Sequence, residues 1–413
     1  MVGRVVVTGL GAVSPLGIGV PALWDGLVAG RSGVRHVQHF DTSNLPVKIA
    51  AEVPDFDPKQ FMDSKSARRM DRFAQFAIAA THEALRDAGL EVTDENRERI
   101  AIVVNTGGGG IPSIEANVTA MAVSGPNRVG PLVIPMFAPN MASSQVSITF
   151  GILGPTITSA AACASGVQAY VDAVRLLHCG EADVVITGGT EAGLTPVALT
   201  SLSHMHALSH RNDDPQRASR PFDADRDGFV FGEGAGILIL ETEEHAARRG
   251  AHVYAEAMGG ALTSDAFHIT APEPTGRGAR AAMTNALKRA EMSPEDIDYI
   301  AAHATATPVG DTVETRAIKA AFGDHALDVS VSANKSMVGH MLGAAGAISA
   351  ISSVLAIRDG VVPPTINLQT PDPECDLSYV PNVAVRRQVD AAMVNGFGFG
   401  GQNASTIFRR FQG

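Results

Sequence analysis

The stretch Thr156-Ile-Thr-Ser-Ala-Ala-Ala-Cys163-Ala-Ser-Gly166 leads from a short β-branched run through small residues toward a helix. From Val167 to Leu177 apolar residues recur at spacings that form one helical face, and Gly180 supplies a stop. Cys163 is therefore expected beside a helix N-terminus, where the helix dipole and free N–H groups favour a thiolate. A small buried cysteine fits the same position, so the stretch predicts a strand-to-helix turn and leaves the nucleophile as a hypothesis.

Short β-branched runs alternate with helical patterns on both sides of this turn. The runs are Val5–Thr8, Ile100–Val104, Val184–Thr187, Ile237–Leu240, Tyr299–Ala302 and Val329–Ser332. The helical patterns are Arg72–Ala88, Val167–Leu177, Arg280–Ala290 and Leu342–Arg358. This alternation favours an α/β fold with buried sheets covered by helices. Gly9 and Gly11 are expected to break the first strand, and a break near Gly250 is expected to divide residues 1–250 from residues 251–413.

Composition narrows the class of protein. The chain has 413 residues, 45% of them hydrophobic and 18% charged, and a net charge of −11. That acidity argues against nonspecific nucleic-acid binding, and three scattered cysteines do not make a disulfide framework. Residues 336–357 carry no formal charge and could span a bilayer, but many Gly, Ala and Ser residues favour a buried helix. We expect a cytoplasmic protein that does not enter the membrane.

Two histidines, His303 and His340, lie at element ends where an active site is expected. His303 follows the hydrophobic run Ile297–Ala302 directly, and active sites of α/β folds gather at the carboxyl ends of strands. His340 is expected to open a Gly/Ala-rich helix, where charge-poor surroundings would lower its pKa and keep it a neutral donor. Lys335 lies on the preceding turn.

These segments together resemble the β-ketoacyl synthases. The motifs that carry the resemblance are the turn at Cys163, His303-Ala-Thr-Ala-Thr-Pro-Val-Gly-Asp311, Lys335-Ser-Met-Val-Gly-His340-Met-Leu-Gly-Ala-Ala-Gly346 and Asn395-Gly-Phe-Gly-Phe399-Gly-Gly-Gln-Asn403. The resemblance runs in order over essentially the whole chain. It implies a thiolase-like five-layer αβαβα sandwich of two similar halves, a homodimer, and acyl and malonyl thioesters delivered by an acyl carrier protein. It implies no diffusible cofactor and no catalytic metal.

The resemblance also assigns roles to residues. Cys163 would attack the acyl thioester, and His303 and His340 would donate hydrogen bonds to the malonyl thioester oxygen. Lys335 would hold the charge balance, with Glu314 as a possible partner. The remaining assignments are backbone N–H groups of Cys163 and Phe399 for the oxyanion hole, Phe399 for the gate, Gly108, Thr305, Thr307 and Gly400 for substrate contact, and Lys65, Arg68, Arg69 and Arg72 for carrier docking.

The sequence departs from the family pattern at a few positions. Ala304 and Ala306 replace residues that are usually Gly and Ser or Gly, which would tighten the turn beside His303. Ser349 and Gln402 replace a usual Glu and a common Thr. Gly108 stands where many relatives have a bulky aliphatic residue, and this change would open the acyl pocket to longer or branched chains.

Other readings stay open at this stage. A cysteine hydrolase also combines Cys with His, but its local signatures are absent and two histidines fit its single-base logic poorly. An inactive partner subunit would lack Cys163, whereas a type II polyketide ketosynthase would share every motif. The cluster His204, His206 and His210 lacks the Cys or carboxylate residues that would complete a metal site, so a surface or entrance role is expected there.

Overall fold

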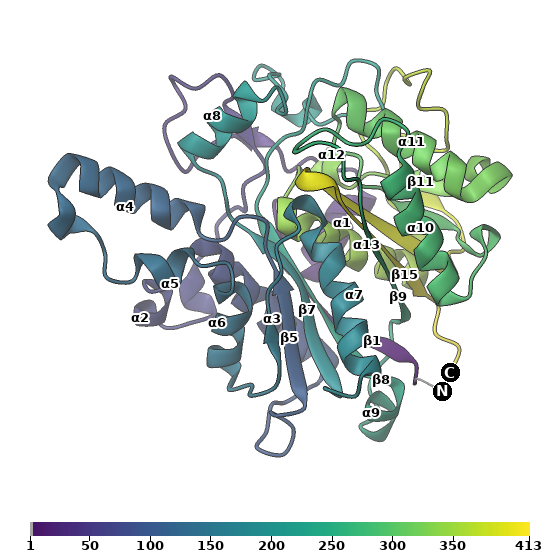
Figure 1. Ribbon diagram of the computed structural model, residues 1–413, viewed down its shortest axis with the longest axis horizontal. Helices are drawn as coiled ribbons and strands as arrows, with labels where there is room; N and C mark the ends of the chain where they lie inside the picture. Colours follow the sequence, from purple (N-terminus) through teal and green to yellow (C-terminus); the bar gives the residue numbers. More distant parts are fainter. Residues whose placement is uncertain (1–2) are drawn as a thin grey trace.

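The computed structural model describes residues 3–413 and contains one continuous twisted sheet with helices on its faces (Figure 1). The strands of its first part are β1 (Val5–Ser14), β5 (Ile100–Asn105), β6 (Thr156–Ile157), β7 (Val184–Glu191) and β8 (Gly234–Thr242). The strands of its second part are β9 (Ala255–Ser264), β10 (Tyr299–Ala301), β11 (Ser330–Ser332), β14 (Ala391–Gly398) and β15 (Gln402–Arg409). The short strands are β2 (Gly17–Ile18), β3 (Arg35–His36), β4 (Ile49–Ala50), β12 (Val361–Val362) and β13 (Val385–Arg386).

The two groups of five strands have the same topology. Their orders are β6-β5-β7-β8-β1 and β11-β10-β14-β15-β9, which is third, second, fourth, fifth, first in each case. In both groups the first three neighbours are parallel and the last two pairings are antiparallel. The groups join where Val6 and Val7 of β1 pair with Glu256 and Ala255 of β9. The chain therefore contains a structural repeat that its letters do not display, and a boundary near Gly250 remains our proposal for its midpoint.

The helices complete five layers, as expected. Helices α3 (Arg72–Ala88) and α6 (Met141–Phe150) cover the outer face of the first group, and α10 (Arg277–Ala290) and α11 (Pro308–Phe322) cover that of the second. Between the groups lie α7 (Ser165–His178) and α13 (Ala345–Asp359). The other helices are α1 (Val20–Val28), α2 (Ser64–Ala67), α4 (Ile111–Ser124), α5 (Val133–Phe137), α8 (Pro196–His204), α9 (Glu243–Arg248) and α12 (Lys335–Val338).

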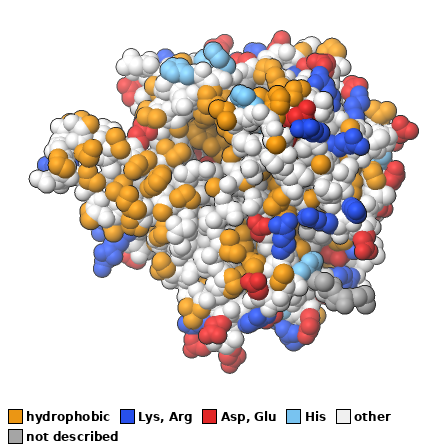
Figure 2. Space-filling model, in the orientation of Figure 1, with side chains coloured by type: hydrophobic (Ala, Val, Ile, Leu, Met, Phe, Trp, Pro, Cys, Tyr) orange, Lys and Arg blue, Asp and Glu red, His pale blue; other side chains and the backbone are white. Residues whose placement is uncertain are grey.

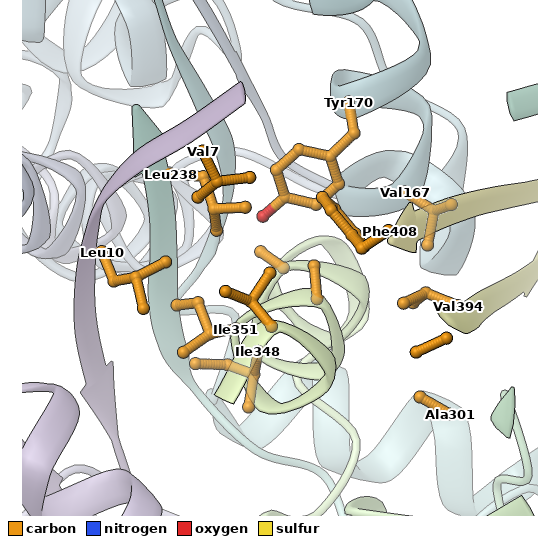
Figure 3. Close-up of a cluster of buried hydrophobic side chains, with 14 of the residues drawn as sticks. Val7, Leu10, Val167, Tyr170, Leu238, Ala301, Ile348, Ile351, Val394 and Phe408 are labelled. Atoms are coloured by element: carbon orange, nitrogen blue, oxygen red, sulfur yellow. The ribbon is translucent and has the colours of Figure 1, made fainter. Parts of the chain in front are cut away.

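The central layer is a core of buried apolar side chains. Tyr170 of α7 packs edge-on against Phe408 of β15, and Ile348 and Ile351 of α13 lie beside them (Figure 3). Within residues 3–413 the one helical segment that is long and apolar enough to cross a bilayer is Leu342–Asp359, and 83% of it is buried inside the protein. Its apolar side chains face protein instead of lipid, as the sequence predicted for a buried helix.

The predicted break in the first strand is wrong. β1 continues through Gly9 and Gly11 because α3 crosses it at very short range. A Cβ at Gly11 would lie 1.9 Å from the carbonyl oxygen of Ala80, and one at Gly9 would lie 2.3 Å from that of Ala84. These glycines allow backbone-to-backbone packing, so their role is close approach rather than a turn.

Candidate active site

Cys163 lies in a strained turn directly before a helix. It occupies the 3-10 turn Ala162–Ala164, and α7 begins at Ser165. Ala162 has φ of +47°, a conformation that costs energy for a residue with a Cβ. The Ser165 hydroxyl fixes the turn by donating to the Ala162 carbonyl at 2.7 Å and accepting from the Ala161 N–H at 2.9 Å. The sequence placed the cysteine correctly between a strand and a helix.

The expected lowering of the thiol pKa is wrong for this structure. Burial raises the pKa of Cys163 to about 11, and the charge of Lys335 and the Phe399 N–H lower it only in part. The carboxylate of Glu191 acts in the raising direction. Desolvation therefore outweighs the helix dipole, and the thiol keeps its proton at neutral pH until a reaction partner accepts it.

His303 stands just beyond the carboxyl end of β10. Glu314 of α11 holds its backbone, because the carboxylate accepts the His303 N–H at 2.8 Å and the Ala304 N–H at 2.6 Å. The ring of His303 meets that of His340 edge-on, with centroids 5.4 Å apart. The two predicted histidines, from segments 37 positions apart, thus form one pair.

His340 is held by its backbone rather than by a helix. Its N–H donates to the Val230 carbonyl at 2.7 Å, and its carbonyl accepts from the Gly232 N–H at 3.0 Å. The predicted helix begins later, with a 3-10 turn at Leu342 and α13 at Ala345, since positive φ at Leu342 interrupts it. Both ring nitrogens of His340 are buried and lack a hydrogen-bond partner among the described residues. They are available to a ligand.

Both histidines are neutral. Burial lowers the pKa of His303 and of His340 well below the usual value, and the charge of Lys335 adds to the effect. For His340 this agrees with the sequence-based expectation. A neutral imidazole can donate one N–H to a developing oxyanion without bringing a charge into the site.

Lys335 is the buried cation of the site. It is the first residue of α12, and burial lowers its pKa to about 8, while the charges of Glu314 and Cys163 act in the opposite direction. No ion pair within 4.0 Å joins Lys335 to Glu314 in the described part of the chain. The expected partnership is therefore a through-space effect, because the Glu314 oxygens are occupied by the backbone beside His303.

The turn after His303 carries the two unusual alanines. Ala304 has φ of +24° and Ala306 has φ of +66°, so both occupy backbone conformations that favour glycine. The Asp311 carboxylate accepts the Ala306 N–H at 3.1 Å. The Thr305 and Thr307 hydroxyls lie 3.1 Å apart, and Thr307 also caps α11. Both alanines therefore place backbone strain beside His303, and a tighter turn here stays a prediction.

The glycine-rich loop near the C-terminus passes over Cys163. A Cβ at Gly398 would lie 3.1 Å from the Cys163 nitrogen. Phe399 follows and is half-buried, and its N–H lies near enough to the thiol to lower the thiol pKa. Gly400 has φ of +79° with open space where a side chain would be, and its N–H donates to the Ile269 carbonyl at 2.8 Å.

Gly108 lies beside a carboxylate that the sequence reading missed. Its N–H donates to Glu191 at 3.3 Å, and a Cβ at Gly108 would lie 2.8 Å from the Ile111 side chain. Glu191 is the last residue of β7, so its place at the carboxyl end of a strand was the signal that could have identified it.

The proposed docking cations divide into two kinds. Lys65, Arg68 and Arg69 are exposed. Arg72 points inward, donating to the buried carboxylate of Glu233 at 2.8 Å and lying over the Phe76 ring. The helical spacing of the four cations suggests one shared face, but Arg72 does not share a face with the other three, because α2 ends at Ala67 and the chain turns before α3 begins.

The cluster His204, His206 and His210 lies in and just after α8. His204 ends α8, and the His210 ring lies 3.3 Å from the Ser203 hydroxyl. In residues 3–413 no group of three His, Cys, Asp or Glu side chains is arranged to hold a metal ion.

Comparison with known proteins gives consistent similarities. Residues 3–246 match the N-terminal domain of β-ketoacyl synthases and residues 254–369 match the C-terminal domain. The 3-oxoacyl-[acyl-carrier-protein] synthase 2 of Synechocystis is 50% identical over 409 residues, covering 99% of this chain and 98% of that protein. The ishigamide ketosynthase/chain length factor is 36% identical with a TM-score of 0.94 and covers all of both chains. The chain is also similar, at 33% identity and a TM-score of 0.92 over 100% of each chain, to a chain of a solved complex. That complex joins a type II polyketide acyl carrier protein to its hexaketide-bound ketosynthase.

Proposed function

The chain belongs to the β-ketoacyl synthase family, and from that premise we propose that it is a condensing acyltransferase of fatty acid elongation. It would join an acyl group to a malonyl group, both carried as thioesters on an acyl carrier protein. The observation that carries the proposal is a buried histidine pair, with ring centroids 5.4 Å apart, beside a buried lysine whose charge acts on both rings and on the buried thiol of Cys163.

The first half-reaction loads Cys163. The sulfur attacks the acyl thioester carbon, and the bond to the carrier sulfur breaks. The thiol proton passes to the departing carrier thiolate, which suits a nucleophile that stays protonated until substrate arrives. Backbone N–H groups of Cys163 and Phe399 would hold the oxyanion, and removal of one such donor typically costs about 3 kcal/mol.

The second half-reaction uses the histidine pair. Malonyl carrier loses CO₂, and the electrons of the broken C–C bond form an enolate whose oxygen accepts N–H donors from His303 and His340. The enolate carbon attacks the carbonyl carbon of the acyl-enzyme and the bond to Cys163 breaks. A 3-oxoacyl carrier two carbons longer leaves, and the Cys163 thiolate takes up one proton from water to restore the thiol. Neutral donors suit this step, because an imidazolium would protonate the enolate instead of stabilising it. The reaction as written consumes no cofactor, and loss of CO₂ drives it.

The carrier protein would dock near α2. Lys65, Arg68 and Arg69 offer three exposed cations, and an acidic partner is attracted to such a patch despite the net charge of −11, since screening limits electrostatic range to about 10 Å. Arg72 would contribute indirectly by fixing α3 to Glu233.

The protein would act as a homodimer in the cytoplasm. Exposed apolar side chains gather on the projecting arm formed by α4 and α5 and on the neighbouring elements, where charged residues are sparse (Figure 2). They include Val123, Ile134, Ile148, Leu153, Ile157 and Val197. β6, which carries Ile157, ends the sheet order and so presents an open edge. A second copy of the chain is the occupant that would cover both the edge and the apolar face.

A type II polyketide ketosynthase is the second candidate, favoured by the similarity at 33% identity to a solved type II polyketide ketosynthase complex. Fatty acid elongation has the stronger support, because identity to the Synechocystis synthase reaches 50% over almost the whole chain. The two functions differ in what happens after one condensation, since a polyketide enzyme extends an unreduced 3-oxo chain again.

The test supplies purified protein with acyl carriers of graded length and malonyl carrier, and follows products by mass. The expected result is one two-carbon extension per acyl group. Repeated extension without reduction would indicate polyketide synthesis, and hydrolysis alone would refute both. Gly108→Ile places bulk against Ile111 and is expected to shift the length preference toward short chains. A wild type confined to short chains would contradict the open pocket.

A further inference from the structure

A buried carboxylate that the proposed reaction does not use lies beneath the site. Glu191 is fully buried, and its Oε2 accepts hydrogen bonds from the Gly107 N–H at 2.7 Å and the Gly343 N–H at 3.0 Å. Its Oε1 accepts from the Thr106 hydroxyl and the Gly108 N–H, each at 3.3 Å. Four donors from two distant loops converge on one side chain.

One of these loops follows His340, and the other lies against the turn that holds Cys163. Gly343 follows His340 by three residues. Gly107 lies next to the nucleophile turn, because a Cβ placed on it would be 3.5 Å from the Ala162 carbonyl oxygen and 2.7 Å from the Glu191 carboxylate. Glu191 therefore touches the backbone that leads to the histidine and the backbone that faces Cys163.

The loops meet through glycines that leave no space for other side chains. A Cβ at Gly343 would lie 2.5 Å from the Gly107 nitrogen. Cβ atoms at Gly166 and Gly189 would lie 2.7 Å and 2.1 Å from the Gly343 carbonyl oxygen. Gly107, Gly166 and Gly189 thus surround Gly343, and the Glu191 carboxylate satisfies N–H groups at this junction that would otherwise be buried without acceptors.

Glu191 also affects Cys163 electrostatically. Its negative charge raises the pKa of Cys163, and Lys335 is the opposing charge. Burial raises the pKa of Glu191 itself to about 7, while the Gly343 and Gly107 N–H groups favour its ionised form.

We propose that Glu191 is a positioning residue of the condensation, which holds the Gly107 turn against the Gly343 turn and so sets the distance between Cys163 and His340. The inference rests on the proposed function. A carboxylate suits this task because both of its oxygens accept hydrogen bonds. An amide replaces one of these oxygens with an NH₂ group, which would face N–H donors instead of accepting from them.

The test compares E191Q and E191A with wild type in two assays. One is the steady-state rate of condensation, normalised to the concentration of Cys163 that iodoacetamide can alkylate. The other is the pH midpoint of that alkylation. We expect kcat per alkylatable site to fall about tenfold to hundredfold in E191A, through misplacement of the reacting groups, with an unchanged KM for acyl carrier. We expect E191Q to be intermediate, and both variants to alkylate at lower pH than wild type.

The matched control is E241Q. Glu241 is an equally buried carboxylate, paired with Arg249 and His245 at the end of β8. We expect E241Q to lose stability but keep the kcat per site and the alkylation midpoint, because a purely structural role does not change either quantity.

Unchanged kcat per site and an unchanged midpoint in E191A would overturn the inference, and the same pair of results in E191Q would overturn it if E191A does not fold. Failure of the proposed function is a different outcome, since wild type itself would then give no 3-oxoacyl product.

Discussion

Replacing Glu314 by alanine should weaken the fold and the histidine pair together. The carboxylate accepts the His303 N–H at 2.8 Å, the Ala304 N–H at 2.6 Å and the Asn395 amide at 3.3 Å. In Glu314→Ala at least the two backbone donors stay buried without acceptors. Each such group costs about 1–3 kcal/mol, so the free energy of unfolding should fall by about 2–6 kcal/mol. Glu314→Gln keeps one acceptor oxygen and should lose roughly half of that.

Two assays separate the consequences. The single tryptophan, Trp24, is buried and donates to Asp359 at 2.7 Å, so its fluorescence reports urea unfolding. Decarboxylation of malonyl carrier by the folded variant reports the histidine pair and should fall at least about tenfold. Glu244→Ala, at an exposed surface pair, is the control and should change stability by less than about 1 kcal/mol. A Glu314→Ala protein with wild-type urea midpoint and wild-type decarboxylation would refute this reasoning.

Three further results are expected. Ala306→Gly removes a Cβ from a residue with φ of +66°, so the free energy of unfolding in urea should rise by about 0.5–1 kcal/mol. The control Ala281→Gly, inside α10, should lower that free energy by about 1 kcal/mol. A loss in both variants would contradict backbone strain at Ala306. The pKa of His340 is lowered in the folded protein, so below pH 6.5 the unfolded chain binds a proton there that the folded chain does not, and the free energy of unfolding falls as pH falls. His340→Asn should reduce this loss by about 1.4 kcal/mol per pH unit. An identical dependence of unfolding free energy on pH in the variant and in wild type would count against a neutral histidine. Ile148→Asp should shift sedimentation from dimer toward monomer, and an unaffected dimer would place the interface elsewhere.

The sequence predicted local features well because their causes are local. The helix Arg72–Ala88 has the predicted bounds, with Asp71 capping its start and Gly89 in the left-handed conformation at its end. The turn at Cys163 and the strand before His303 were also predicted, since hydrophobic periodicity and small residues mark them directly.

The features that were missed depend on contacts between distant segments. The β-branched run in the sequence covers Val184–Thr187, whereas β7 continues to Glu191. A Cβ at Gly188 would lie 1.9 Å from the Gly236 carbonyl oxygen, so this glycine permits strand contact instead of ending the strand. The continuation places Glu191 at the strand end, a position that the β-branched run alone does not indicate. The inward ion pair of Arg72 with Glu233 joins residues 161 positions apart and has no local signal either.

The measurement that bears most directly on the central claim is mass analysis of the protein after exposure to acyl carrier, followed by malonyl carrier. The account predicts an acyl adduct on the peptide containing Cys163, its disappearance on addition of malonyl carrier, and a 3-oxoacyl carrier two carbons longer in equal amount. It also predicts no adduct in Cys163→Ala. An adduct on another residue, or loss of the acyl group as free acid without the longer product, would contradict it.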